Sequence, residues 1–450
     1  MAKIDSPPKK VIDLVKAFNK TGFEIYIVGG SARGLITQYP VSDWDLTTNA
    51  KPEQVQALFP KNSFYNNRFG TVSIVTGKKK TDIFEVTTYR TEQGYSDKRR
   101  PDQVSWGKTL EEDLQRRDLT INAIAIDWLA QKIIDPHQGQ KDLKNKIIRT
   151  VGNPDQRFQE DALRLIRAVR IATQLGFMIE AKTLSSIKKN SKLIDDIAKE
   201  GIRDELLKLL SSDYPADGIT LLYNTGLLER IIPELIEGRG IDQAKHHTDD
   251  VWTHNLKTLQ HCPSKNPIVK LAALLHDIGK PKTAQGEGEE RTFHNHEVAG
   301  AIMTKEIGKR LRFSKKQIDQ LYTLVRWHQF TPNEKQTDKA IRRFIRRVGT
   351  DNLQDILDIR TGDRLGSGVP ETSWRTELFK KRLIEVQKQP FSIKDLKIDG
   401  NDIMKILKIK PGPEIGKILK TLFEEVEEDK DKNTKECLTE RVLCHRERTK

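Results

Sequence analysis

Apolar residues follow two different spacings along the chain, and the change between them divides it. In residues 11–20 they recur at helical spacing, and a strand-like run at 23–28 then ends at two glycines. We therefore predict a helix, a strand, a glycine turn and a second helix in succession. Three further runs have strand composition, namely 72–75, 83–88 and 121–126.

From residue 157 onward the apolar spacing is helical almost throughout. Leu163, Ile166 and Val169, for example, fall on one face of a predicted helix. Turns containing Pro and Gly separate the helices. We predict an α+β fold in which a mixed head is followed by helical regions, with the boundaries 1–150 for the head, 151–235 for a neck, 236–370 for a middle region and 371–450 for a tail.

The composition indicates a soluble, modular protein with an anionic partner. The chain has 450 residues, of which 36% are apolar and 32% charged, and a formal net charge of +14. Such a charge favours nucleic acid or nucleotides, because Lys and Arg that neutralise phosphates release counterions. A solvated Lys-rich surface would give the same charge without binding anything.

Cysteines and apolar runs bear on the compartment. Cys262, Cys437 and Cys444 are too few and too scattered for a disulfide framework. The sequence has neither a signal-peptide pattern nor a run of about 18 apolar residues. We expect a cytoplasmic protein.

Candidate catalytic residues gather after the first predicted strand. Gly29 and Gly30 are followed by Arg33, and then by Asp43 and Asp45. Residues i and i+2 of a strand face the same side, so the two carboxylates would lie together and could hold two Mg²⁺ ions. Glycines and a helix N-terminus leave room and N–H donors for a phosphate. Either motif alone is also common in turns and surface pairs, whereas their close succession is specific.

These segments resemble a known family. Gly29-Gly30-Ser31-Ala32-Arg33 and Asp43-Trp44-Asp45-Leu46-Thr47-Thr48 are similar to the first motif of class II tRNA nucleotidyltransferases and bacterial poly(A) polymerases, members of the DNA polymerase beta superfamily. The resemblance implies a polymerase-beta-like head that adds nucleotides without a template. Further matching segments follow in the family's order at 69–71, 85–90, 116–123 and 160–170.

The resemblance also implies how a nucleotide is chosen and held. Asp161 and Arg164, which we expect one turn apart on one helix, would imitate the Watson–Crick edge of a base. In isolation the same spacing fits an ordinary salt bridge. Glu85 is a candidate third carboxylate near the attacking hydroxyl, or else a surface residue of its strand. The other candidate nucleotide-binding residues are Gly29, Gly30, Arg33, Arg117, Asp118, Asn122, Arg167 and Arg170.

Two segments of the head bear on specificity. The family's first motif usually has Asp after the arginine, whereas this chain has Gly34, and we interpret the missing carboxylate as one with a local structural role. The loop 91–107 resembles the segment that the family uses when specificity passes from C to A. A merely solvated loop is the alternative.

A second set of candidate metal ligands lies in the helical middle. His254, His276, Asp277 and Asp363 resemble the ligand pattern of HD phosphohydrolase domains, and His296 and His328 lie between them in sequence. This resemblance implies a second divalent ion and hydrolysis of phosphate monoesters or cyclic phosphates at RNA ends. The alternative is a helical bundle that keeps the HD pattern without the chemistry.

We expect the chain to add CCA to the 3′ end of tRNA from CTP and ATP. The alternatives are an enzyme that adds only the terminal A, a poly(A) polymerase, and an HD phosphohydrolase with an inactive head. Residues 66–71 resemble the tRNA enzymes rather than the poly(A) polymerases. The lysine-rich segment 391–422 could bind tRNA phosphates, or form a solvated helical surface.

Overall fold

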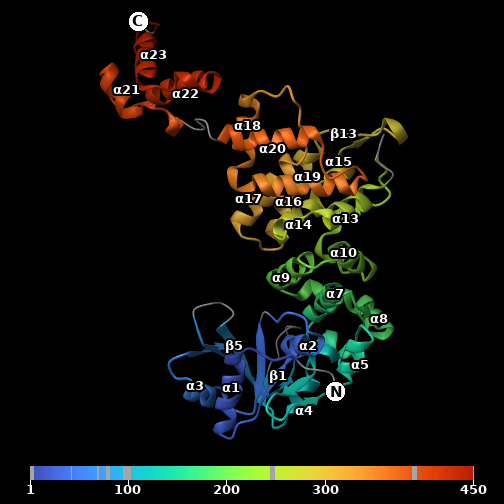
Figure 1. The fold of residues 1–450 in the computed structure, drawn as a ribbon. Helices are drawn as coiled ribbons and strands as arrows, with labels where there is room; N and C mark the ends of the chain where they lie inside the picture. The colour runs from blue at the N-terminus through green and yellow to red at the C-terminus, as the bar shows by residue number, and fades with distance from the viewer. Residues whose placement is uncertain are drawn as a thin grey trace. The chain divides into compact units, whose positions relative to one another are not determined.

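The computed structural model describes residues 5–41, 43–67, 70–77, 82–94, 103–243, 249–387 and 393–448. The chain forms two compact units, which are drawn in Figure 1. The first comprises Met1–Gly238 and Ile307–Ser314, and the second Arg239–Glu306 and Lys315–Lys450.

A mixed sheet organises the first unit. In the described residues its strand order is β3-β4-β5-β2-β1-β8-β9, and β2 and β5 run parallel, whereas the other neighbours are antiparallel. The expected mixed sheet is therefore confirmed. The strands are β1 Ile25–Val28, β2 Trp44–Thr48, β3 Ser63–Asn67, β4 Thr71–Val75, β5 Ile83–Thr88, β8 Ala125–Asp127 and β9 Lys132–Ile134.

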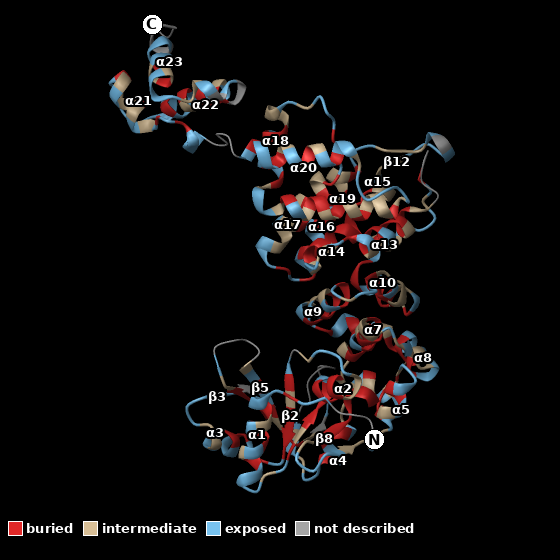
Figure 2. Cartoon of the chain, viewed as in Figure 1, coloured by how far each residue is buried: buried red, intermediate tan, exposed pale blue. Residues whose placement is uncertain are grey.

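Short helices cover this sheet. Helix α1 buries Val11, Leu14, Val15 and Phe18, which helical spacing places on one face. Each such side chain contributes roughly 1.5–3 kcal/mol on full burial. Figure 2 shows the buried residues following the strands and the inner faces of the helices. The helices are α1 Lys9–Lys20, α2 Gly29–Thr37, α3 Pro52–Leu58, α4 Leu110–Gln115 and α5 Gly139–Lys144, and a separate hairpin joins β6 Arg90–Gln93 to β7 Gln103–Trp106.

The strand predicted at 121–126 is mostly wrong. Thr120–Asn122 form the 3₁₀ helix η2, and the extended chain starts only at Ala125 in β8. The cause is local, because the Asp118 carboxylate accepts hydrogen bonds from Leu119 N and Asn122 Nδ2. Such side-chain bonds compete with strand pairing.

Seven helices in the described residues continue the first unit. They are α6 Pro154–Glu160, α7 Leu163–Leu175, α8 Ala181–Asn190, α9 Lys199–Leu210, α10 Pro215–Asn224, α11 Leu228–Ile231 and α12 Pro233–Ile236, with η3 Ser191–Asp196 between α8 and α9. A two-stranded parallel sheet joins β10 Ile147–Ile148 to β11 Met178–Ile179.

The expectation that Asp161 and Arg164 share one helix is wrong. Asp161 has φ −138° and ψ 100° and ends α6, while Arg164 lies in α7. The Asp161 carboxylate accepts a hydrogen bond from Leu163 N at 3.0 Å. Asp161 therefore ends α6, and its side chain bonds to the first residue of α7.

The second unit is helical, as expected. Its helices are α13 Val251–His261, α14 Pro267–Leu275, α15 Lys280–Thr283, α16 His296–Arg310, α17 Lys315–Trp327, α18 Asp338–Val348, α19 Leu353–Gly366, α20 Trp374–Gln387, α21 Gly400–Leu407, α22 Pro413–Glu428 and α23 Lys435–Arg448, and the last residues of α16 belong to the first unit. Short segments complete it, namely β12 Ala284–Gln285, β13 Thr292–Phe293, η4 Gly288–Glu290, η5 Thr350–Asn352, η6 Ile393–Asp395 and η7 Lys430–Lys432.

Two glycines let α13 and α19 approach closely. A Cβ on Gly362 would lie 2.6 Å from Thr258 O, and one on Gly366 would lie 2.9 Å from Thr258 N. The backbones of the two helices can therefore pack directly. Among the described residues, none of the helices has both the length and the apolar content needed to cross a membrane.

Candidate functional site

The predicted aspartates lie at the start of β2. Trp44 begins the strand, so Asp43 precedes it and Asp45 lies within it. Ser31 of α2 holds this turn: its hydroxyl donates to Asp43 O at 2.8 Å and accepts from Asp45 N at 2.9 Å. The parallel register places Asp45 opposite Glu85 of β5. Ser31 is part of the Gly29–Arg33 motif, but its role depends on this tertiary contact, which the motif does not predict.

Asp43, Asp45 and Glu85, which we call the head carboxylates, influence one another electrostatically. Burial raises the pKa of Glu85, and the charges of Asp45 and Asp43 raise it further. Burial also raises the pKa of Asp45, against the opposing effect of Arg117. Carboxylates in such mutual repulsion are suited to hold a divalent cation.

Glycine is required beside Asp45. Gly29 has φ +64°, a backbone conformation that favours glycine. A Cβ there would lie 3.4 Å from Asp45 Oδ2 and 3.3 Å from Arg117 Nη1. The absence of a side chain lets the carboxylate and the guanidinium lie against the backbone at the start of α2.

Gly34, where the family usually has Asp, occupies a tight contact. A Cβ at this position would lie 2.5 Å from Val41 Cγ2 and 3.0 Å from Tyr39 O. A larger residue therefore requires the segment 39–41 to move. In this chain the position is adapted to packing against Val41.

Four predicted nucleotide-binding residues form a connected network. Arg33 Nη1 donates to Asn122 Oδ1, and Asn122 Nδ2 donates to Asp118 Oδ1 at 3.2 Å. Arg167 Nε lies 3.1 Å from Asp118 Oδ2. Burial alone would raise the pKa of Asp118, but Arg167 and Arg164 hold it at about 2. Burial and the charge of Arg170 lower the pKa of Arg33 to about 10.

Asp113 is a positioning residue that sequence reasoning missed. It is fully buried and pairs with Arg116 at 2.7 Å and with Arg117 at 3.0 Å. Thr47 of β2 donates to the same carboxylate at 3.3 Å. The only signal in the sequence was the i,i+3 and i,i+4 spacing of one acidic and two basic residues.

Asp161 and Arg164 lie close together but have other partners. Arg164 Nε is 3.9 Å from Asp161 Oδ2, whereas Arg164 Nη1 donates to Glu160 Oε2 at 2.9 Å. Arg164 Nη2 donates to Arg116 O at 3.1 Å. Arg170, the last predicted member of this set, pairs with Glu205 at 2.8 Å.

Part of the predicted specificity loop lies outside the described residues. Of the segment 91–107, the structure describes 91–94 and 103–107. Phe69 of the 69–71 motif also lies outside the described part. Within it, a Cβ on Gly70 would lie 2.5 Å from Trp106 Cζ3, so this strand end packs against the hairpin.

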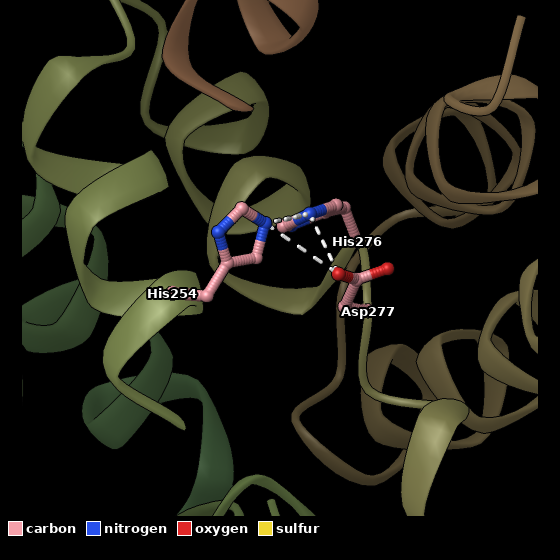
Figure 3. A group of neighbouring side chains, drawn as sticks. All are labelled: His254, His276 and Asp277. Carbon is pink, nitrogen blue, oxygen red and sulfur yellow. Dashed lines mark hydrogen bonds and ion pairs between the residues drawn. The ribbon is translucent and has the colours of Figure 1, made fainter. Parts of the chain in front are cut away.

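The second unit brings the four predicted HD residues together. His254 comes from α13, His276 and Asp277 follow α14, and Asp363 lies in α19. His254 Nε2 is 3.1 Å from His276 Nε2, 3.5 Å from Asp277 Oδ2 and 3.2 Å from Asp363 Oδ1. Figure 3 shows His254 and His276 pointing at one oxygen of Asp277. His254, His276 and Asp277 could hold a metal ion.

Neighbouring groups fix the orientation of these side chains. His276 Nδ1 contacts Ala273 O at 2.8 Å, Lys280 donates to Asp277 Oδ2, and Arg360 donates to Asp363 Oδ2 at 3.0 Å. Burial lowers the pKa of His276. Against the effect of burial, His276 and Lys280 keep the pKa of Asp277 well below its usual value. The residues line a cavity of about 570 Å³.

Three known families match separate segments of the chain. Residues 25–149 match the "Poly A polymerase head domain", residues 176–238 the "Probable RNA and SrmB-binding site of polymerase A", and residues 301–442 "tRNA nucleotidyltransferase domain 2 putative". Among solved structures, that of the Bacillus stearothermophilus CCA-adding enzyme in complex with CTP is similar to this chain. The two are 27% identical, the match covers 99% of each chain, and the TM-score is 0.74.

The curated relatives described next are also CCA-adding enzymes. The CCA-adding enzyme of Lactobacillus helveticus (strain DPC 4571) is 44% identical over 234 residues, which are 51% of this chain and 58% of that enzyme. The chain thus spans little more than half the length of this relative. The CCA-adding enzyme of Lactococcus lactis subsp. cremoris (strain SK11) is 31% identical over 438 residues, which are 96% of both chains. The chain therefore belongs to the CCA-adding enzyme family of class II tRNA nucleotidyltransferases.

Proposed function

We propose that the chain adds CCA to the 3′ end of tRNA from CTP and ATP, without a template. The observation that carries this proposal is the arrangement of the head carboxylates, in which Asp45 lies opposite Glu85 and beside Arg117. Family membership supports the substrate. Such an enzyme would act in the cytoplasm, as expected from the sequence.

The head carboxylates are suited to bind divalent ions. Asp43 and Asp45 offer oxygen ligands, and their repulsion of each other and of Glu85 calls for a cation between them. Two Mg²⁺ ions bound there would activate the terminal 3′-hydroxyl and neutralise the leaving pyrophosphate.

The chain's own groups would position the two substrates. The reaction joins the 3′ oxygen of the RNA to the α-phosphorus of the nucleotide and releases pyrophosphate and the hydroxyl proton. Arg117 and the Arg33–Asn122–Asp118 network would hold the triphosphate and ribose. Glu85 would lie near the attacking hydroxyl.

Asp161 and Arg164 would select the base. A carboxylate accepts and a guanidinium donates, so the pair can contact the pairing edge of C or A. Glu160 accepts from Arg164 Nη1 and Arg116 O accepts from Arg164 Nη2, which fixes the guanidinium. The Nε edge, which lies toward Asp161, is the part that we assign to the base.

Offering defined tRNA ends tests the specificity. The full-length protein is given tRNA ending at the discriminator base, at C or at CC, with each nucleotide and Mg²⁺. We expect CTP to extend the first two ends and ATP to extend only the CC end. Extension of the CC end alone would indicate an enzyme that adds only A, and long A tails on unrelated RNA would indicate a poly(A) polymerase.

A second candidate function is favoured by the histidine cluster of the second unit. We propose that His254, His276, Asp277 and Asp363 bind a divalent ion there, because their ligand atoms converge in a buried cavity. This site would hydrolyse phosphate monoesters or cyclic phosphates at RNA ends. His276→Gln should remove both the bound metal and the release of phosphate, and retention of both would overturn the assignment.

A further inference from the structure

A row of residues crosses the sheet of the first unit at the head carboxylates. Asp45 of β2 lies opposite Glu85 of β5. Glu85 lies opposite Ser73 of β4, and Ser73 lies opposite Phe64 of β3. Residues directly opposite each other on neighbouring strands project from the same face of a sheet. Phe64 therefore projects from the face that carries the carboxylates.

Phe64 is exposed although its side chain is apolar. It is 49% exposed, because β3 is the last strand on this side of the sheet in the described residues and Ser73 beside it is short. Among the described residues of β2, β3, β4 and β5, it is the one aromatic side chain on the carboxylate face. Since single exposed apolar residues are common, its position in this row is what indicates a function.

The two substrates would reach the carboxylates from different sides. Strands β1 and β8 lie on one side of β2, and β5, β4 and β3 lie on the other. The residues proposed to hold the nucleotide come from the first side, since Arg33 lies in α2 directly after β1, and Asn122 lies in η2 before β8. The attacking and leaving oxygens are in line in this kind of transfer. The RNA end would therefore approach over β5, β4 and β3.

We propose that Phe64 binds the 3′ end of the RNA by stacking on one of its last three bases. This inference deepens the proposed nucleotide addition and rests on it. Neighbouring strands are about 4.8 Å apart, which puts Phe64 about 10 Å from Glu85 along the row. Stacked bases are about 3.4 Å apart, so about three of them span that distance.

An aromatic ring suits an RNA end whose bases change as it grows. Every base has a π face, so stacking accepts the discriminator base, C and A alike. Hydrogen bonds to the base edges would instead favour one of them. Phe64 thus holds the growing end without a preference, while Asp161 and Arg164 select the incoming nucleotide.

Neighbouring side chains of β3 provide a matched test in the full-length protein. Phe64→Ala removes the ring, and Phe64→Tyr keeps it. Tyr65→Ala is the control, because Tyr65 is 43% exposed and projects from the other face of the strand, opposite Val72. Each protein binds tRNA ending in CC in which 2-aminopurine replaces one of the last three bases in turn. Stacking quenches the fluorescence of 2-aminopurine. Incorporation of AMP into the unlabelled tRNA gives kcat and KM.

We expect Phe64→Ala to remove the quenching at one of the three positions. It should also raise the KM for tRNA roughly 10- to 100-fold, which is the contribution of one stacked base. The KM for ATP and the melting temperature should not change, and Phe64→Tyr should behave like the unsubstituted protein.

Two results would overturn the stacking: unchanged quenching and KM in Phe64→Ala, or an equal effect in Tyr65→Ala. Quenching that depends on Phe64 in a protein that adds no nucleotide would overturn the proposed function and leave the stacking intact.

Discussion

At the scale of single residues, the head depends on how a few side chains hold the carboxylates. Ser31 is fully buried and bonds to both sides of the turn that carries Asp43 and Asp45. Asp118 is held between Arg167 and Asn122. We expect Ser31 to act by positioning the proposed metal ligands, and Asp118 to act as part of the network proposed to hold the nucleotide.

Ser31→Ala tests this positioning role. Loss of the two hydrogen bonds should cost about 1–2 kcal/mol of unfolding free energy and lower kcat for nucleotide addition roughly 100-fold, because small displacements of catalytic groups are costly. Thr37→Ala is the control, since it removes an intrahelical bond at the other end of α2. Equal losses of kcat in the two variants would show that Ser31 has no special role.

Gly34→Ala tests the tight contact with Val41. The added Cβ should cost roughly 1–3 kcal/mol of unfolding free energy, measured by urea denaturation, because overpacking forces the segment 39–41 to shift. Val41→Ala removes the obstructing methyl group and should recover part of that cost in the double variant. Strictly additive effects of the two substitutions would contradict the packing explanation.

Asp118 should make stability depend on acid pH. Its pKa is 3.8 in an unperturbed carboxyl and about 2 in the folded protein. Because the pKa of Asp118 is lower in the folded protein than in the unfolded chain, its ionised carboxylate stabilises the fold at pH values above about 4. This contribution of about 2 kcal/mol is lost as the pH falls from about 4 to about 2. The difference in unfolding free energy between the protein and Asp118→Asn should therefore shrink over that interval. A difference independent of pH would refute the assignment.

At the scale of elements, helix α19 brings the proposed metal ligands of the second unit together. Gly362 and Gly366 lie on either side of Asp363 in sequence. Because they have no side chains, α19 can pack closely against α13, which carries His254. The packing of two helices therefore sets a distance between two side chains that are far apart in sequence.

Gly362→Ala should weaken metal binding in the second unit. Its Cβ would meet Thr258 O at 2.6 Å, which forces the helices apart and moves Asp363 away from His254. We expect a roughly 10- to 100-fold loss of metal affinity, measured by calorimetry. Gly416→Ala is the control, because that position faces open space. Unchanged affinity in Gly362→Ala would disprove the role of close packing.

The sequence predicted elements where the apolar pattern is regular. Helix α1 and strands β1, β4 and β5 match their predicted ranges closely. Helix α1 and strand β5 each bury one face, whereas β1 and β4 are buried along nearly their whole length. The prediction failed at 121–126, where the Asp118 carboxylate bonds to the following backbone and favours a turn. It failed again at Asp161, which ends α6 and whose side chain bonds to Leu163 N at the start of α7.

The candidate sites were predictable as motifs but not as contacts. Asp43 and Asp45 follow from their spacing, whereas the role of Ser31 depends on a hydrogen bond between α2 and β2. His296 and His328 were visible in the sequence, but their place beside Asp277 depends on helix packing. Such tertiary contacts have no periodic signature.

At the scale of the whole molecule, the functions proposed above would give the two units two kinds of chemistry. The first contains the head carboxylates and the arginines around them, and the second contains the histidine cluster. The net charge of +14 suits one anionic substrate for both, namely RNA and its phosphate ends. Loss of function in one unit should therefore leave the other measurable.

The central claim is that the head carboxylates catalyse nucleotide addition. Single-turnover incorporation of AMP into tRNA ending in CC tests it in Asp43→Ala and Asp45→Ala, with Asp13→Ala on the exposed face of α1 as the matched control. We predict that each head variant loses at least about a thousandfold in rate, because the lost ligand holds an ion needed in the transition state. Incorporation by either head variant at the rate of Asp13→Ala would contradict the account.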